Sequence, residues 1–448
     1  MPPKDSTALI VARFLKSNNY NESYDAFIAE AGLPSDAGTV AKGDLILETL
    51  LEEKKAFDLS SQFERLGMDE DEDRSWRQPA PSVAEPLQTL PSRSNILSIG
   101  AQKSTVFVTS ADRQLHILDS NARFHATSLT GMQDSPILCC KVWHDHYLLT
   151  GSMSGQLILS DFSGHVFEKR RDHSKYIVQI ATYYDDFIAT AGWDNKISIY
   201  RPLPSVDGQP CLGDVVSTIV LPSKPEAMIF IQDEESRQPI LLVSRTDSSF
   251  LYYYTVNSEP HLVGRQNLAP HSNAWVAFTP SAFALCPTDT SLLAVALSTV
   301  PHMKLAIIRL LVPPYHQTTT SGRDLQSPQG NDNLSSETQA SQARAALAIA
   351  DREEAAILVH CNTLAPQTAY STPAVVWRPN GTGVWVNGDD GVVRGIESVT
   401  GKIVTTLHGH DVGSKVRCLW AGNIGKDGEE ILLSGGFDQK LIAWKIPQ

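Results

Sequence analysis

A strand–turn–strand unit that recurs about every 40 residues constrains the fold of this chain more than any other feature. Copies occur at residues 107–118, 148–159, 188–200, 386–396 and 432–444. Their turns hold Asp112, Ser154, Asp194, Asp390 and Asp438. The first three turn residues are 42 and 40 positions apart, and the last two are 48 apart. A period of this length is typical of a ring of four-stranded sheets, with one sheet for each unit.

Two weaker copies fill the long gap between Asp194 and Asp390. Residues 245–256 and 295–311 also place β-rich runs around a turn. The sequence therefore predicts a mainly β, seven-bladed β-propeller over residues 95–448. The sequence stops after the third strand of the last blade, so we expect an upstream segment near residues 86–92 to supply the fourth strand and close the ring.

The last unit resembles a repeat of the WD family. Gly409-His410 precedes a strand, Ser434 lies in the next strand, Asp438 lies in the turn and Trp444 ends the third strand. The resemblance implies a structural tetrad in which histidine bonds the aspartate and the serine, and tryptophan bonds the serine. A Ser/His/Asp set can also suggest a hydrolase, but no Gly-x-Ser-x-Gly elbow surrounds this serine.

The resemblance implies a second, incomplete tetrad of His173, Thr190 and Asp194. Tyr200 stands where tryptophan is usual. The other units depart further from the pattern, since the tryptophan position holds Leu118, Ser160 or Ile396. The propeller is therefore expected to be of a diverged WD-repeat type.

The N-terminal residues 6–33 predict two short helices with apolar stripes. The stretch 9–33 resembles the LisH motif, with Phe14, Asn19 and Tyr24 as its departures. Asn19 can adopt the left-handed turn that glycine takes freely. The resemblance implies homodimerisation of residues 1–34; a helical hairpin docked on the propeller is the alternative. The predicted dimerisation residues are Leu9, Ile10, Phe14, Leu15, Tyr20, Tyr24 and Phe27.

Three further segments have a distinct composition. Residues 35–66 continue with leucine and phenylalanine at helical spacing and predict a helical extension. Residues 67–94 begin with the acidic run 69–73 and continue with prolines, as expected for a linker. Residues 313–350 are polar and rich in Gly, Ser, Thr and Gln, which predicts a disordered insertion.

Charge and cysteine content limit the possible functions. The net charge of −13 makes nucleic-acid binding an unlikely role, because duplex binding needs clustered cations. No pair among the six cysteines has CxxC spacing, and no apolar run reaches 18 residues. We therefore expect no cofactor, no metal, no catalytic residues and no membrane span, and a cytoplasmic or nuclear location.

Several surface residues were weighed as binding sites. Trp193 and Phe437 precede the turn aspartates of their units and are candidate partner contacts, with packing against the next blade as the alternative. The sequence 144–146 (His-Asp-His) reads as a solvated turn rather than a metal site. The basic run 169–171 reads as an exposed turn, with a contact to an acidic partner as the second choice.

Together these features predict a non-enzymatic scaffold that binds itself through the LisH motif and other proteins through the propeller. The layout resembles dynein and microtubule regulators, transcriptional corepressors, and subunits or substrate receptors of ubiquitin ligases. The sequence leaves these three alternatives open.

Overall fold

The computed structural model describes residues 7–40, 46–48, 74–87, 90, 93–120, 125–206, 209–233, 236–270, 278–313, 339–424 and 428–447. They belong to two compact units, residues 1–73 and residues 74–448. Each unit is described by itself. No helix among the described residues combines the length and the apolar composition that a membrane crossing requires.

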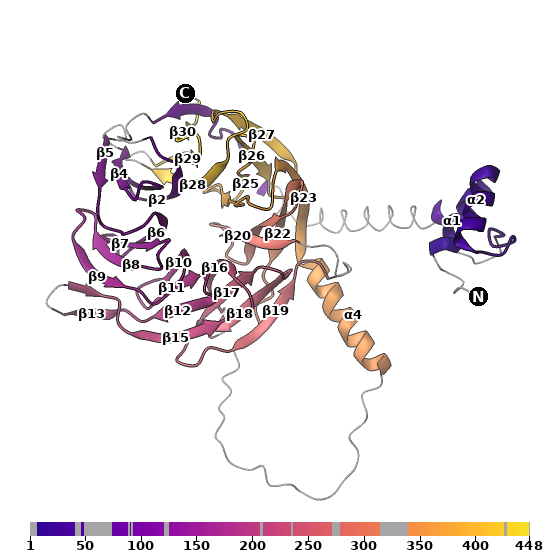
Figure 1. Cartoon of the computed structure of the whole chain (residues 1–448), viewed down its shortest axis with the longest axis horizontal. Coiled ribbons are helices and arrows are strands. Elements are labelled where there is room, and N and C mark those ends of the chain that lie inside the picture. Colours follow the sequence, from indigo (N-terminus) through magenta and orange to yellow (C-terminus); the bar gives the residue numbers. More distant parts are fainter. Residues whose placement is uncertain are drawn as a thin grey trace, which may run out of the picture. The chain divides into compact units, whose positions relative to one another are not determined.

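The second unit is a propeller of seven four-stranded antiparallel sheets, arranged as a ring in Figure 1. This confirms the predicted fold class. The two weak copies at 245–256 and 295–311 form the middle strands of blades four and five. We call the face on which every innermost strand begins the upper face. Strand register places the turn between the second and third strands on the same face.

The strands fall into four concentric sets. The innermost strands of blades one to seven are β2 (Ile96–Gln102), β6 (Ile137–Trp143), β10 (Ile177–Tyr183), β16 (Pro225–Gln232), β20 (Thr279–Leu285), β24 (Val375–Trp377) and β28 (Val416–Ile424). The second strands are β3 (Thr105–Ser110), β7 (Tyr147–Ser152), β11 (Phe187–Gly192), β17 (Pro239–Arg245), β21 (Leu292–Ser298), β25 (Gly383–Val386) and β29 (Glu429–Gly436).

The third strands are β4 (Leu115–Asp119), β8 (Leu157–Asp161), β12 (Lys196–Tyr200), β18 (Phe250–Thr255), β22 (His302–Arg309), β26 (Val392–Glu397) and β30 (Leu441–Lys445). The outer strands are β5 (His125–Leu129), β9 (Val166–Arg170), β15 (Val215–Val220), β19 (Leu262–Asn267), β23 (Ile357–Pro366), β27 (Ile403–His408) and β1 (Val83–Pro86). A small hairpin of β13 (Leu203–Val206) and β14 (Gln209–Cys211) precedes the outer strand of blade three.

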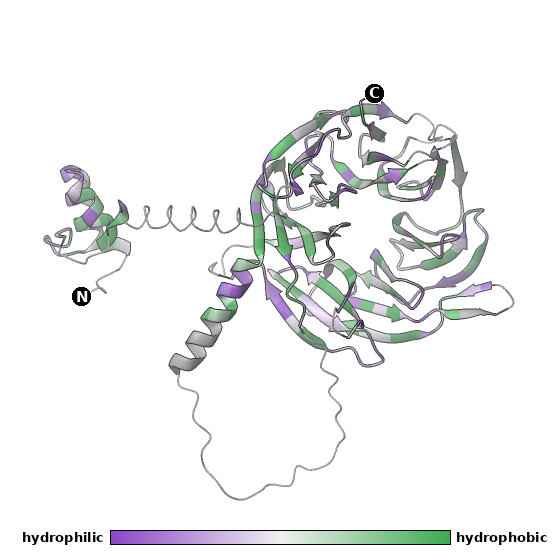
Figure 2. Cartoon of the chain, turned by 180° about the vertical axis from the view of Figure 1, so that it is seen from behind, coloured by the Kyte–Doolittle hydropathy of each residue, from purple (hydrophilic) through white to green (hydrophobic). Residues whose placement is uncertain are grey.

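The second and third strands form the core of the ring. In β7, β11 and β21 all residues but one are buried, because each blade is covered on both faces by its neighbours. These strands consist of apolar residues with small or β-branched polar ones, as in Phe-Ile-Ala-Thr-Ala-Gly of β11. Figure 2 shows the apolar residues concentrated along the strands.

The ring closes through β1, which pairs with β30 from Val83↔Lys445 to Pro86↔Ile442. A closing strand was expected near residues 86–92, and β1 begins slightly earlier, at Val83, and overlaps that stretch at Pro86. The backbone N–H of Leu87 still bonds the carbonyl of Leu441, and the Leu87 side chain is buried in the core between blades seven and one.

The predicted insertion 313–350 is not wholly irregular. Helix α4 (Gln339–Ala355) occupies its last part and leads directly into β23. Its sequence contains neither glycine nor proline and is rich in alanine, the strongest helix former. The prediction of disorder was therefore wrong for residues 339–350, and residues 314–338 lie outside the described part of the chain.

The first unit is a helical hairpin of α1 (Thr7–Ser17) and α2 (Asn21–Ala31). Asn19 takes the expected left-handed conformation, with a φ of 59°, and so does Gly32, which ends α2. Residues 35–40 form turns, so the helical extension predicted for 35–66 was wrong there. Of residues 41–66, the structure describes only 46–48.

Candidate interaction surfaces

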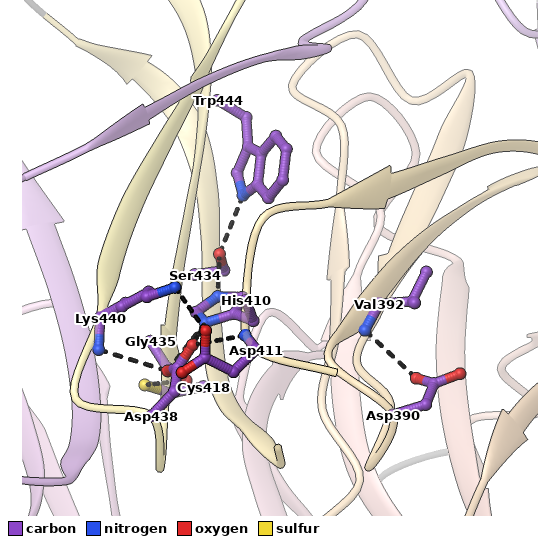
Figure 3. A network of polar contacts seen from close by, with 10 residues as sticks. All are labelled: Asp390, Val392, His410, Asp411, Cys418, Ser434, Gly435, Asp438, Lys440 and Trp444. Carbon is purple, nitrogen blue, oxygen red and sulfur yellow. Dashed lines mark hydrogen bonds and ion pairs between the residues drawn. The ribbon is translucent and has the colours of Figure 1, made fainter. Parts of the chain in front are cut away.

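The four tetrad residues of blade seven form one hydrogen-bonded chain (Figure 3). His410 Nδ1 lies 3.0 Å from both carboxylate oxygens of Asp438. Because a carboxylate only accepts, Nδ1 carries the hydrogen. His410 Nε2 accepts from the Ser434 hydroxyl at 2.8 Å, and this oxygen accepts from Trp444 Nε1 at 2.8 Å. The chain runs in one direction and satisfies every buried polar group in it.

The charge of Asp438 is held by this network. Burial acts to raise the pKa of Asp438, but the hydrogen bond and electrostatic attraction of the His410 ring and the hydrogen bonds from the backbone N–H groups of Asp411 and Lys440 together outweigh burial. The pKa of Asp438 therefore lies below its ordinary value. Ser434 is fully buried, and its oxygen already accepts from an indole. The Ser434 hydroxyl is thus engaged on both sides within the tetrad.

Blade three contains the second tetrad. His173 Nδ1 bonds Asp194 at 2.9 Å, and His173 Nε2 bonds the Thr190 hydroxyl at 2.8 Å. Tyr200 occupies the tryptophan position, and its hydroxyl donates to Asp172 at 3.0 Å. As in blade seven, burial acts to raise the pKa of Asp194, but the hydrogen bond from His173 and those from the backbone N–H groups of Ser174 and Lys196 together outweigh it, and the pKa is lowered.

Other blades brace the same position with different side chains, which sequence comparison with the motif does not reveal. In blade one, His116 lies on the third strand, 3.0 Å from Ser110 and 2.7 Å from Ser128. Burial lowers the pKa of His116, although the nearby charge of Asp112 acts to raise it. In blade two, the Gln133 amide donates to Thr150 at 3.0 Å.

Blade six uses an ion pair instead. Arg394 donates two hydrogen bonds to Asp390, at 2.5 and 3.2 Å. The buried Asn387 amide donates to the carbonyl of Val416 in blade seven at 2.7 Å. The diverged units are thus braced by ordinary buried hydrogen bonds, and the missing tryptophans do not leave open blades.

The two predicted partner contacts, Trp193 and Phe437, lie on the upper face, 38% and 40% exposed. Trp193 stacks on Tyr176, with ring centroids 5.1 Å apart, and the Lys224 ammonium lies 4.7 Å from its ring. The cations near Phe437 are neutralised, since Lys415 pairs with Asp389 and Lys440 with Asp411. The two aromatic residues therefore sit in different electrostatic surroundings.

The predicted basic run 169–171 is largely occupied within the blade. Arg170 bonds Asp172 at 2.9 Å, and Arg171 bonds Asp134 at 2.5 Å. At the His-Asp-His turn, His144 pairs with Asp185 of the next blade. Nowhere in the described part of the chain do three or more metal-ligating side chains gather.

In the helical unit, the predicted dimerisation residues divide into two groups. Tyr24 is buried with Ala12 and Ile28, and Leu15 and Phe27 pack against this cluster. The Tyr24 hydroxyl donates to the carbonyl of Ser35 at 2.9 Å and accepts from the N–H of Gly38. These side chains hold the hairpin together and are spent within one chain.

A second group, Leu9, Ile10, Phe14 and Tyr20, lies outside that cluster. Tyr20 is 52% exposed, and its ring centroid lies 6.2 Å from that of Phe14. Ile10 and Phe14 are one helical turn apart on α1 and half-buried. Among the described residues, Ile10, Phe14 and Tyr20 thus form an apolar group apart from the core of the hairpin.

Residues 74–80, predicted to be linker, form a strap that packs on blades six and seven. The Trp76 ring meets Trp385 edge-on, with centroids 5.3 Å apart. The backbone N–H of Trp76 donates a hydrogen bond to the Glu397 carboxylate at 3.0 Å. A side chain added at Gly383 or Gly395 would lie 2.5 or 2.6 Å from the Trp76 ring, so the two glycines form the slot that receives it.

Arg378 holds the strap in place through hydrogen bonds and ring contact. It is fully buried, lies 4.5 Å from the Trp76 ring centroid, and donates to the carbonyls of Arg77 and Pro79 at 2.7 and 3.1 Å. It also pairs with Glu430 of blade seven through bonds of 2.9 and 2.8 Å. The linker prediction was wrong for residues 74–87, because one tryptophan and one buried arginine fix this proline-rich stretch. Trp76 was the sequence signal for it.

Comparison with known families places both units. The model of the UCP007778 family, β-propeller domain, matches residues 70–445, and the LisH domain of the same family matches residues 5–35. The chain thus combines a LisH domain with a seven-bladed propeller and belongs to the UCP007778 family. Among curated proteins, none matches this chain.

Proposed function

We propose that this protein is a non-catalytic scaffold that dimerises through its LisH domain and binds other proteins on its propeller. The co-occurrence of the two domains in one chain carries the proposal. A dimer presents two propellers, so a partner with two binding sites meets the second at a raised effective concentration. We further assign the propeller to the WD-repeat type, on the strength of the tetrads in blades three and seven.

The non-catalytic role is supported by the burial of the Ser-His-Asp sets. Ser434 and Thr190 are fully buried, and their hydroxyls are committed to the histidines. The six free cysteines fit a reducing compartment, in keeping with a cytoplasmic or nuclear location. Dynein regulation, transcriptional corepression and ubiquitin ligation are the three settings in which such a scaffold is proposed to act.

Dimerisation is tested by sedimentation of the full chain beside a variant lacking residues 1–66. We expect a dimer and a monomer, respectively. Phe14→Asp should also give a monomer, because the apolar face of α1 cannot bury a charge. Asp25→Ala, on the exposed side of α2, is the matched control and should remain dimeric. A monomeric full-length protein would rule the proposal out.

The choice among the three settings is made by affinity purification and mass spectrometry of the intact protein. Dynein subunits, histone deacetylases and RING subunits are the respective expected partners. A co-purified protein is assigned to the propeller only if the variant lacking residues 1–66 also retains it and a purification without bait does not.

A further inference from the structure

The upper face of blade three combines an exposed indole with lysines. Trp193 is flanked by Tyr176 and by the ammonium of Lys224. Lys175 lies in the loop before β10 and Lys196 at the start of β12, and both are exposed. Within the described chain neither lysine pairs with a carboxylate. We call these five residues the Trp193 patch. Its positive charge stands out in a protein whose net charge is −13.

The carboxylates around the patch offset part of its charge, and most of them are engaged within their blades. Asp194 is committed to His173, and Asp172 to Arg170 and Tyr200. Burial raises the pKa of Glu226 to about 7, against the effect of Lys224, so this carboxyl carries only part of its charge near neutral pH. Asp247 remains as an exposed carboxylate on the neighbouring turn of blade four.

The patch is built on a fixed framework. The N–H of Trp193 bonds the carbonyl of Tyr176 at 2.9 Å, and the N–H of Leu221 bonds the carbonyl of Asn195 at 2.8 Å. These bonds tie together the loops that lead into blades three and four. The tetrad of His173 and Asp194 holds the turn from below, with the Ser174 N–H bonded to Asp194 at 3.0 Å. A preorganised surface loses little entropy when a ligand binds.

We propose that the Trp193 patch is the docking site for an acidic peptide segment of a partner protein, with an apolar side chain of the peptide lying on Trp193 and its carboxylates pairing with Lys175, Lys196 and Lys224. Charge complementarity selects this occupant. The inference rests on the proposed scaffold function and names the chemistry of the partner.

A long polyanion fits the upper face less well than a short segment. Nucleic acid binding needs a cationic track along the backbone. In blades six and seven the lysines of the upper face are neutralised by Asp389 and Asp411, as described for Phe437. The cationic area around blade three therefore does not continue across blades six and seven, and a few peptide residues can lie on it.

The test begins with selection of a random peptide display library on the immobilised full-length protein. The triple variant Lys175→Glu, Lys196→Glu, Lys224→Glu serves for counter-selection. We expect the enriched peptides to be net acidic and to contain an apolar residue. Enrichment of neutral or basic peptides, or no enrichment, overturns the proposal.

The most enriched peptide is then synthesised with a fluorescent label and titrated by fluorescence anisotropy. Trp193→Ala and the triple lysine variant should each weaken binding by about tenfold or more. Binding should also weaken steeply as salt is raised. The lysine variant leaves the aromatic pair intact, so it reports on charge even if Trp193→Ala lowers stability.

Two matched controls locate the site. Phe437→Ala removes the equivalent aromatic residue where the cations are neutralised, and Lys402→Glu reverses an exposed lysine that follows β26, away from the upper face. Both should bind within about twofold of the unaltered protein. Equal binding by all variants overturns the assignment of the site but leaves the scaffold proposal standing. The scaffold proposal would instead be overturned by a full-length chain that is monomeric and has no protein partners. Displacement of the peptide by short single-stranded DNA more readily than by the unlabelled peptide assigns the patch to nucleic acid instead.

Discussion

At the scale of single residues, the propeller shows how far a motif can be trusted. The tetrad residues of blades three and seven were found from the sequence, because their spacing is fixed by strand lengths and turns. The structure brings them together as hydrogen-bonded sets. The braces of blades one and six were missed because His116 and Arg394 come from the third strand. The brace of blade two was missed because Gln133 replaces histidine in the loop before β6. Several kinds of side chain can therefore supply the buried hydrogen bonds that brace a blade.

Removal of the Ser434 hydroxyl should destabilise the propeller. Ser434→Ala leaves Trp444 Nε1 and His410 Nε2 without partners in a buried site, which costs about 1–3 kcal/mol of the free energy of unfolding. Urea unfolding followed by tryptophan fluorescence measures the change. Ser414→Ala, in the loop before β28, is the control and should lie within about 0.5 kcal/mol of the unaltered protein. A similar stability for both variants would contradict the bracing role.

The stability contributed by Asp438 should depend on pH. Its pKa is lowered in the folded state, so the contribution is complete above the unfolded pKa of about 3.9 and is lost as the pH falls through the folded pKa. The difference in unfolding free energy between the unaltered protein and Asp438→Asn should therefore shrink below about pH 4. Equilibrium unfolding at several pH values measures it. A difference that stays constant down to pH 3 would show that the charge of Asp438 is not what matters.

At the scale of elements, the strap is the main feature that the sequence did not disclose. Composition predicted a linker, and the proline content of residues 79–91 supported that reading. The position of the strap depends on contacts with residues that are distant in the sequence, namely Trp385, Arg378 and the two glycines of the slot. Helix α4 was missed for a related reason, because its polar composition masked a high helix propensity.

The fit of Trp76 into its slot can be measured by a double-mutant cycle. Trp76→Ala should cost about 2 kcal/mol of unfolding free energy through lost burial. Gly395→Ala should also destabilise, since the added carbon would lie 2.6 Å from the Trp76 ring. Combining them should cost less than the sum, because the smaller residue 76 removes the clash. Additive effects would mean that the glycine is needed for its other neighbours, Thr405 and Trp385.

The Arg378–Glu430 pair joins blades six and seven and should respond asymmetrically. Glu430→Ala alone leaves a buried guanidinium uncompensated and should cost about 3–5 kcal/mol. Replacing both residues, as Arg378→Met with Glu430→Leu, should cost less than Glu430→Ala, because no charge is left buried. Chemical denaturation provides the comparison. If the double replacement proved the worse of the two, the bonds from Arg378 to the strap carbonyls would be the dominant contribution.

At the scale of the whole molecule, the propeller could be predicted from its rhythm, including the two blades without motif residues. The residue at which the propeller begins could not be predicted, because closure depends on which upstream residues pair with the edge of β30. In the LisH domain, the split of the apolar residues was equally beyond the sequence. Tyr24 and Phe14 look alike in the pattern, yet only Tyr24 is spent on the fold of one chain.

The part played by residues 74–86 is separable from that of the LisH domain. A variant lacking residues 1–73 should keep the melting temperature of the propeller, since its strap and β1 are intact. A variant lacking residues 1–86 should melt markedly lower and expose the edge of β30. Circular dichroism melts and hydrogen exchange of the β30 amides are the measurements. Equal melting temperatures would show that ring closure adds nothing measurable.

Blade seven also determines how the molecule responds when it is pulled. Val83 at the start of β1 lies beside Lys445 at the end of β30, so a force applied through the two ends of the propeller would open this ladder one bond at a time, like a zip, rather than shear it as a whole. The strap lies upstream of that ladder, and Trp76 and its arginine clamp would take the load first. Under tension, the propeller would therefore be held by the contacts of Trp76 and Arg378 and not by the β1–β30 ladder.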